Sequence, residues 1–273
     1  MHVYIEAAFD SAVAVEPGES LIQWFRAAWA RLLDGLVAEE ASGGQRVLSL
    51  ASVTQDIDDG PRRFSDINET WGHFEESLAA FPWGAGITVL KDGAELTGLG
   101  SVSTYHVLSD ASLWRAEVSV PVDPQDAGSC ATLVDFLREA LEGANPAFGR
   151  IELNGTVEET NLDAALRRKK RTSMRESRQF LRGYAWVTVC PAELLARLGG
   201  ASALEASGAF YRVIPLRAGG ALLQASETLA GYSDAVMERV FVALAPVLPE
   251  GEPHPDPACP DLRFVPRDAA TAR

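Results

Sequence analysis

The stretch NLDAALRRKKRTSMRESRQFLRGYAWVTVC, residues 161–190, joins a strongly basic segment to an apolar one. It holds eight of the 24 lysines and arginines of the chain. On a helical wheel Leu162 and Leu181 fall on one side and the arginines on the other, which predicts one long amphipathic helix over 162–182. The apolar run 184–189 predicts a buried strand. We therefore interpret this stretch as the joint between two α+β halves.

A cationic stripe follows the outer side of the predicted helix. Its members are Arg167, Arg168, Arg171, Arg175, Arg178 and Arg182, and apart from Arg168 they follow one another at spacings of four, four, three and four residues. Like charges one helical turn apart repel each other by about 0.2–0.5 kcal/mol per pair, so acidic groups are expected opposite them. Those groups belong either to the rest of the chain or to a partner. Two interpretations stay open, a solvated helix face and a site that binds a protein partner or an anion.

Length and composition describe an ordinary globular chain. With 273 residues, 47% of them hydrophobic and 23% charged, it is long enough for one large domain or two modest ones. No apolar run approaches the ~20 residues that a membrane span needs. The N-terminus reads as a strand and lacks the basic region of a signal peptide. The three cysteines are far apart and show neither a disulfide framework nor a metal-binding pair, so we expect a cytoplasmic protein.

Charge is distributed unevenly along the chain. Residues 1–160 carry 26 acidic and nine basic side chains, whereas 161–182 carry two and eight. The net charge of −14 repels phosphate backbones at long range, so nucleic acid is an unlikely ligand. A cationic protein partner would be attracted instead, although acidity also serves solubility alone.

The order of predicted elements divides the chain into three parts. These are an N-terminal α+β half over 1–158, a second half over 159–248 that starts with the basic helix, and a proline-rich arm over 249–273. Lys91-Asp92-Gly93 is a hairpin signal in the first half. Strands and helices recur in a similar order in both halves, which predicts an α+β fold with antiparallel or mixed sheets flanked by helices.

Short catalytic signatures are absent from the sequence. It contains no nucleophile elbow, phosphate-binding loop, dinucleotide fingerprint or H-E-x-x-H motif. The acidic loop 55–64 lacks the glycine and glutamate positions of a calcium-binding EF-hand. We predict neither a metal nor a cofactor.

Four residues remain candidates for a pocket between the two halves. His73 and Glu75 form an H-x-E pair on a predicted helix, and Tyr105 and His106 end a predicted strand. Zinc deaminases use such a pair, but the P-C-x-x-C motif that completes their site is missing. A surface position or a hydrogen-bonded structural role is the simpler interpretation of each histidine.

The last third of the chain resembles a known family. The stretches GYAWVTV at 183–189, LGG at 198–200, GGALLQA at 219–225 and LAPV at 244–247 are similar to the closing module of the type VI immunity family. Proteins of this family are encoded beside secreted toxins and are thought to neutralise them by binding. The resemblance covers roughly 183–248. It implies a binding protein and brings no catalytic residues with it.

Two functions therefore stay open. The first is a cytoplasmic protein-binding module, immunity-like, whose partner would be a cationic toxin. The alternative is a small-molecule enzyme or anionic-ligand binder with a pocket between the halves, built from the histidine candidates or from the arginine stripe. The sequence favours the first, because charge segregation and missing catalytic motifs both agree with it.

Overall fold

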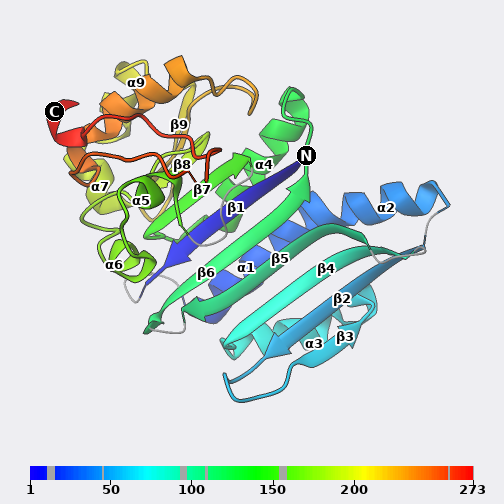
Figure 1. Ribbon diagram of the computed structural model, residues 1–273. Coiled ribbons are helices and arrows are strands. Elements are labelled where there is room, and N and C mark those ends of the chain that lie inside the picture. Colours follow the sequence, from blue (N-terminus) through cyan, green and yellow to red (C-terminus); the bar gives the residue numbers. More distant parts are fainter. Residues whose placement is uncertain are drawn as a thin grey trace.

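One antiparallel sheet runs through the protein (Figure 1). The computed structural model describes residues 1–10, 16–44, 46–92, 97–107, 110–153, 159–257 and 259–272. Its ten strands are ordered β3-β2-β4-β5-β6-β1-β7-β8-β10-β9. Each pair of neighbours is antiparallel, and β1 lies between β6 and β7. The N-terminal strand therefore joins strands β2 to β6, on one side of it, to strands β7 to β10 on the other.

The strands differ in length on the two sides of β1. The bounds are β1 His2–Phe9, β2 Arg46–Thr54, β3 Arg62–Ser65, β4 Gly84–Asp92, β5 Thr97–Val107, β6 Asp110–Pro121, β7 Phe148–Leu153, β8 Val187–Cys190, β9 Arg212–Pro215 and β10 Ala221–Gln224. The first part of the sheet contains the long strands β2, β4, β5 and β6, with the short β3 at its edge, and the short strands β7 to β10 form the second part.

Helices flank this sheet. They are α1 Pro17–Ala28, a π-helix Trp29–Leu33, α2 Asp34–Ser42, α3 Ile67–Ala79, α4 Ala127–Ala140, α5 Asn161–Ala165, α6 Lys170–Arg175, α7 Ala192–Arg197, α8 Ala201–Ala206 and α9 Asp234–Leu244, with 3-10 turns at Ala245–Val247 and Ala269–Ala272. Local sequence sets several starts. Pro17 occupies the first turn of α1, and the carboxylate of Asp126 accepts a hydrogen bond from Ser129 N at the start of α4.

In the first part of the sheet, helices cover one face. Alternate residues of β4, such as Ile87 and Val89, are fully buried, and those between them are partly exposed. The helical side is identified by Gly100 of β5, where an added Cβ would lie 3.0 Å from a Leu33 methyl group. In Figure 1, α1, α2 and α3 lie behind these strands, and no described helix lies in front of β2, β4 and β5. The alternation is the period of two that a half-covered sheet requires.

In the second part, the C-terminal segments cover the near side of the sheet (Figure 1). The chain from α5 onward packs over β1 and β7, because the guanidinium of Arg182 reaches Glu6 of β1. The arm after α9 is fixed by a hydrogen bond from Val265 N to the hydroxyl of Tyr184, at 2.8 Å. The predicted proline-rich arm therefore runs over the surface of the second part.

The predicted α+β class is confirmed, and the ladders of the described strands are antiparallel throughout. The division at 158/159 stays a prediction, and residue 158 lies outside the described part of the chain. The sheet crosses this division, since β7 pairs with β8. Gly93 of the hairpin signal also lies outside the described residues, but β4 and β5 do pair as neighbouring antiparallel strands.

The single long helix over 162–182 is wrong. The segment contains two short helices, α5 and α6, and then consecutive turns. Arg167, between them, adopts a left-handed conformation with φ of 54°. A non-glycine residue rarely adopts this conformation, so the surrounding contacts fix it there.

Two absences concern the described residues. Among the described helices, none combines the length and the apolar character needed to cross a membrane. In the same part of the chain, no group of three histidine, cysteine or acidic residues is placed to hold a metal ion.

Candidate functional site

A cluster of buried charges lies where the first part of the sheet meets the second. Its members come from β1, β6, β7 and the segment after β7, and each is less than 10% exposed: Glu6, Arg115, Glu117, Arg150, Glu152, Asp163 and Arg182. We call this set the buried charge cluster. Strand register brings it together, because Glu6 of β1 is paired with Glu117 of β6 on one side and with Arg150 of β7 on the other.

Glu6 is the centre of the cluster. Its carboxylate accepts from Arg150 Nε at 3.0 Å and lies 3.1 Å from Arg115 Nε and 3.4 Å from Arg182 Nη1. Arg115 also contacts Glu117 and donates to the hydroxyl of Tyr4 at 2.8 Å. Burial alone would raise the pKa of Glu6, but the three arginines outweigh burial and hold this pKa below its ordinary value. Glu6 is therefore ionised at neutral pH.

The far end of the cluster behaves differently. Glu152 lies 2.7 Å from Arg150 Nη1, and Arg150 is shared with Glu6. Burial raises the pKa of Glu152 above its ordinary value, and Glu6 adds to the increase. Two carboxylates that share one guanidinium thus have pKa values shifted in opposite directions, which marks this pair as a site candidate.

The predicted arginine stripe is distributed over different partners. Arg182 is fully buried between Glu6 and Asp163, and Arg168 bridges Asp163 and Glu176, with both distances at 2.9 Å. Asp163 pairs with both Arg168 and Arg182. The six arginines therefore do not form one continuous helical face. Arg182 belongs to the interior and is not available on the surface.

The other four arginines of the stripe lie nearer to solvent. Arg178 pairs with Asp10 and Glu193, at 2.8 and 2.9 Å, and Arg175 pairs with Asp110. Arg167 and Arg171 are exposed, and within the described part of the chain no acidic side chain forms an ion pair with either. Four members of the stripe thus have intramolecular acidic partners, and binding of a guest by the stripe stays a prediction that now depends on Arg167 and Arg171.

The four pocket candidates contact separate partners. His73 is exposed beside Glu76, and Glu75 accepts hydrogen bonds from Arg26 and from Trp71 Nε1. These contacts lie on α3.

The other two candidates point to opposite faces of β5, as adjacent strand residues do. The hydroxyl of Tyr105 donates to Glu117 at 2.5 Å, whereas His106 stacks on Trp83 with ring centroids 5.2 Å apart. Among the described contacts, none joins the α3 pair to the β5 pair. A pocket built from all four therefore stays a prediction.

The face of β2, β4 and β5 that points away from the helices is rich in small polar side chains. Strand register aligns three rows of it, Ser52 with Gly86 and Ser103, Leu50 with Thr88 and Ser101, and Thr54 with Gly84 and Tyr105. We call these nine residues the open face. Leu50 is 43% exposed and the other eight are partly exposed. Part of this face forms a hollow of about 510 Å³ over β3, β2 and β4.

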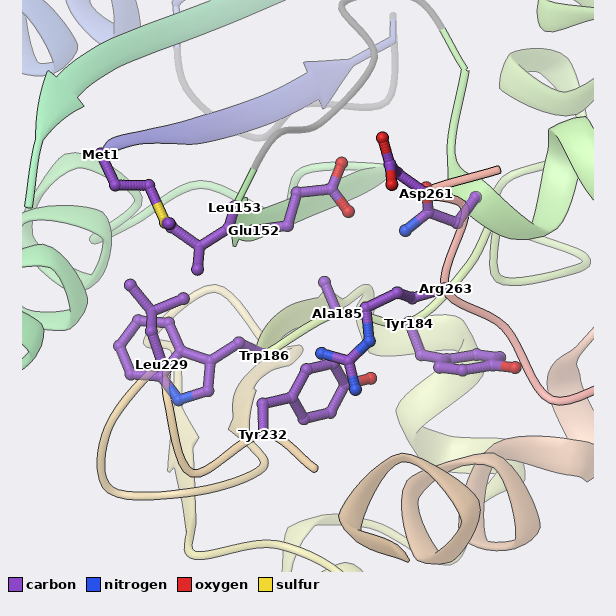
Figure 2. Close-up of a pocket in the computed structure, with 11 residues that line it drawn as sticks. Met1, Glu152, Leu153, Tyr184, Ala185, Trp186, Leu229, Tyr232, Asp261 and Arg263 are labelled. Atoms are coloured by element: carbon purple, nitrogen blue, oxygen red, sulfur yellow. The ribbon is translucent and has the colours of Figure 1, made fainter. Parts of the chain in front are cut away.

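A second hollow lies under the C-terminal arm. Its volume is about 290 Å³, and Figure 2 shows the side chains that line it. Glu152 of the buried charge cluster is one of them. We call this hollow the arm cavity.

Sequence reasoning missed the central residues of these sites. The pattern within each strand does not distinguish Glu6, Arg115 or Arg150 from ordinary strand residues. A signal was present, because the pattern R-x-E occurs at 115–117 and again at 150–152. In a strand this spacing places both charges on one face, and two such strands flank Glu6.

The comparison with solved structures finds a similarity, and this similarity concerns the fold. No family model matches the chain, and no curated protein matches it. Among solved structures it is similar to the type VI secretion system (T6SS) protein PA0821 of Pseudomonas aeruginosa, with a TM-score of 0.60 and 16% sequence identity. The similarity covers 92% of this chain and 78% of that one. The chain therefore shares its fold with a type VI secretion system protein over nearly its whole length, beyond the last third.

Proposed function

We propose that the chain is a protein-binding module of the immunity type, which neutralises a cognate toxin by occluding it. The observation that carries this proposal is the open face. Serine, threonine and glycine provide adaptable hydrogen bonding at low cost in side-chain entropy, and Tyr105 adds a rigid aromatic surface at its edge. The shared fold with a type VI secretion system protein supports the same conclusion.

The charge of the protein indicates the charge of the partner. The helical layer behind the sheet, residues 16–44, 66–80 and 123–142, carries 14 carboxylates and three arginines. Together with the net charge of −14, this layer produces a negative field around the molecule. Such a field accelerates the approach of a cationic protein, while the contacts of the open face determine how long the complex lasts.

The proposal also includes a location. A protein that occludes a toxin delivered into the cell acts in the cytoplasm, and the three free cysteines suit that compartment.

The experiment is a titration with the protein encoded by the neighbouring gene, followed by calorimetry. Thr88→Arg places a long cation in the middle of the open face, and we expect it to weaken binding by about a hundredfold, or about 2.7 kcal/mol. Ala131→Arg on the exposed side of α4 adds the same charge outside this face and serves as the matched control. Equal affinities of the two variants would refute the open face as the docking surface.

A further inference from the structure

The arm cavity is built from segments far apart in the sequence. Its lining includes Met1 at the N-terminus and Glu152 of β7. Trp186, directly before β8, Leu229, in the loop before α9, and Arg263, on the arm, line it as well. Its volume of about 290 Å³ is at the lower end of the range for small-molecule sites. It lies on the second part of the sheet and shares no residue with the open face.

One end of the arm cavity is acidic. In Figure 2 the carboxylates of Glu152 and Asp261 lie at the same end of it. Glu152 is 7% exposed, and its contact with Arg150 occupies one carboxylate oxygen. Asp261 is exposed, on the arm. Oxygen atoms of both carboxylates therefore remain available to a hydrogen-bond donor.

The other end is apolar. The indole of Trp186 and the side chain of Leu229 form it, and both residues are at most 5% exposed (Figure 2). The indole N–H is already used, because it donates to Ser226 O at 2.8 Å. This end therefore offers an aromatic face and methyl groups to a ligand and no further donor.

The lining also contains a buried polar group without a partner in the described structure. The hydroxyl of Tyr232 has no hydrogen-bond partner in the described structure, although the residue is only 9% exposed. Arg263 stacks over its ring, 5.2 Å from the centroid, and donates to Asp234 at 2.8 Å. A buried hydroxyl without a hydrogen-bond partner is unfavourable, and a bound ligand that pairs with it would remove this penalty.

We propose that the arm cavity binds a small molecule that carries a primary ammonium group on an apolar body of about one ring. The ammonium group is held by Glu152 and Asp261, and the body packs against Trp186 and Leu229. The lining carries two carboxylates, one guanidinium and the N-terminal ammonium group of Met1. The guanidinium of Arg263 is already paired with Asp234, and a cation is the charge that is complementary to the acidic end. An ammonium group has three donors, and two of them can pair with oxygen atoms of the two carboxylates.

The test uses phenethylamine as the probe and 2-phenylethanol as its neutral counterpart, with calorimetry on the full chain. We expect the amine to bind at least about tenfold more tightly than the alcohol, since a charge-assisted hydrogen bond is stronger than a neutral one. Glu152→Gln keeps the shape of the side chain and should remove this preference. Glu205→Gln, at an exposed position on α8, is the matched control and should retain it.

Asp261→Asn makes the test independent of folding, because this residue is exposed and its change leaves the interior intact. We expect this variant to bind the amine about threefold to tenfold more weakly, with the alcohol unaffected. Absence of binding at millimolar amine, equal binding of amine and alcohol, or unchanged affinity in both carboxylate variants would overturn the proposal. Thr88→Arg should bind the amine normally, so this result is separate from that of the open face.

Discussion

Replacing Glu6 by glutamine removes the central negative charge of the buried charge cluster while keeping the size of the side chain. Three guanidinium groups lie within 3.0 to 3.4 Å of its carboxylate oxygens. At an effective dielectric constant of about 20, each such pair contributes about 4 kcal/mol before desolvation is counted. Losing one partner of a buried ion pair costs about 3–5 kcal/mol, because the remaining charges stay buried and uncompensated.

We therefore expect Glu6→Gln to lower the free energy of unfolding by about 4 kcal/mol, out of a total of about 5–15 kcal/mol for a natural domain. The melting temperature should fall by about 10 °C. The assay is urea unfolding at pH 7, followed by circular dichroism and by tryptophan fluorescence. Coincidence of the two curves is needed before the free energies are compared.

The matched control is Asp135→Asn. Asp135 pairs with Arg138 at 3.7 Å on the surface of α4, where both side chains are nearly half exposed. Exposed pairs of this kind contribute about 0–1 kcal/mol. A loss below about 1 kcal/mol for Glu6→Gln, similar to the control, would refute the reasoning that the cluster fixes β1 between β6 and β7.

Three further predictions concern stability. The folded pKa of Glu6 is below its ordinary value of 4.5, so the contribution of Glu6 to the free energy of unfolding is complete above that pH and is lost as the pH falls through the folded pKa. In urea unfolding the difference in this free energy between wild type and Glu6→Gln should therefore shrink in acid. Arg182→Ala should cost about 3–5 kcal/mol and Arg171→Ala less than about 0.5, by the same assay; similar losses would contradict the placement of Arg182 in the interior. Gly149→Ala should lower the melting temperature in scanning calorimetry, at a cost of about 1–3 kcal/mol, because its Cβ would lie 2.6 Å from a Val189 methyl group; an unchanged melting temperature would show that β7 and β8 are packed less closely.

Much of the fold could be predicted from the sequence because apolar periodicity reports directly on burial. The strand at β1, the helix α4 and the pairing of β4 with β5 follow from such patterns and from turn chemistry. The basic segment differs from the single helix that its sequence predicts, and the reason is physical. A helical wheel treats Asp163, Arg168 and Arg182 as independent surface residues. In the fold both arginines pair with Asp163, and the chain leaves the helical conformation at Arg167.

The candidate sites were harder to predict because they depend on register. Glu6 reads as a solvent-facing residue in an amphipathic strand until its neighbours β6 and β7 are known, and both place arginines beside it. The arm cavity joins residue 1 with residue 263, and nothing local in either segment indicates the other. The open face is a third case, since serine and threonine in strands suggest exposure but do not show that a face lacks a covering layer.

The most direct test of protein binding by the open face is amide hydrogen exchange, measured with and without the protein encoded by the neighbouring gene. The proposal predicts added protection in β2, β4 and β5, centred on Ser52, Thr88 and Ser103, with the helices α1 to α4 unchanged. Protection confined to those acidic helices, or to the basic segment around Arg167 and Arg171, would contradict the account.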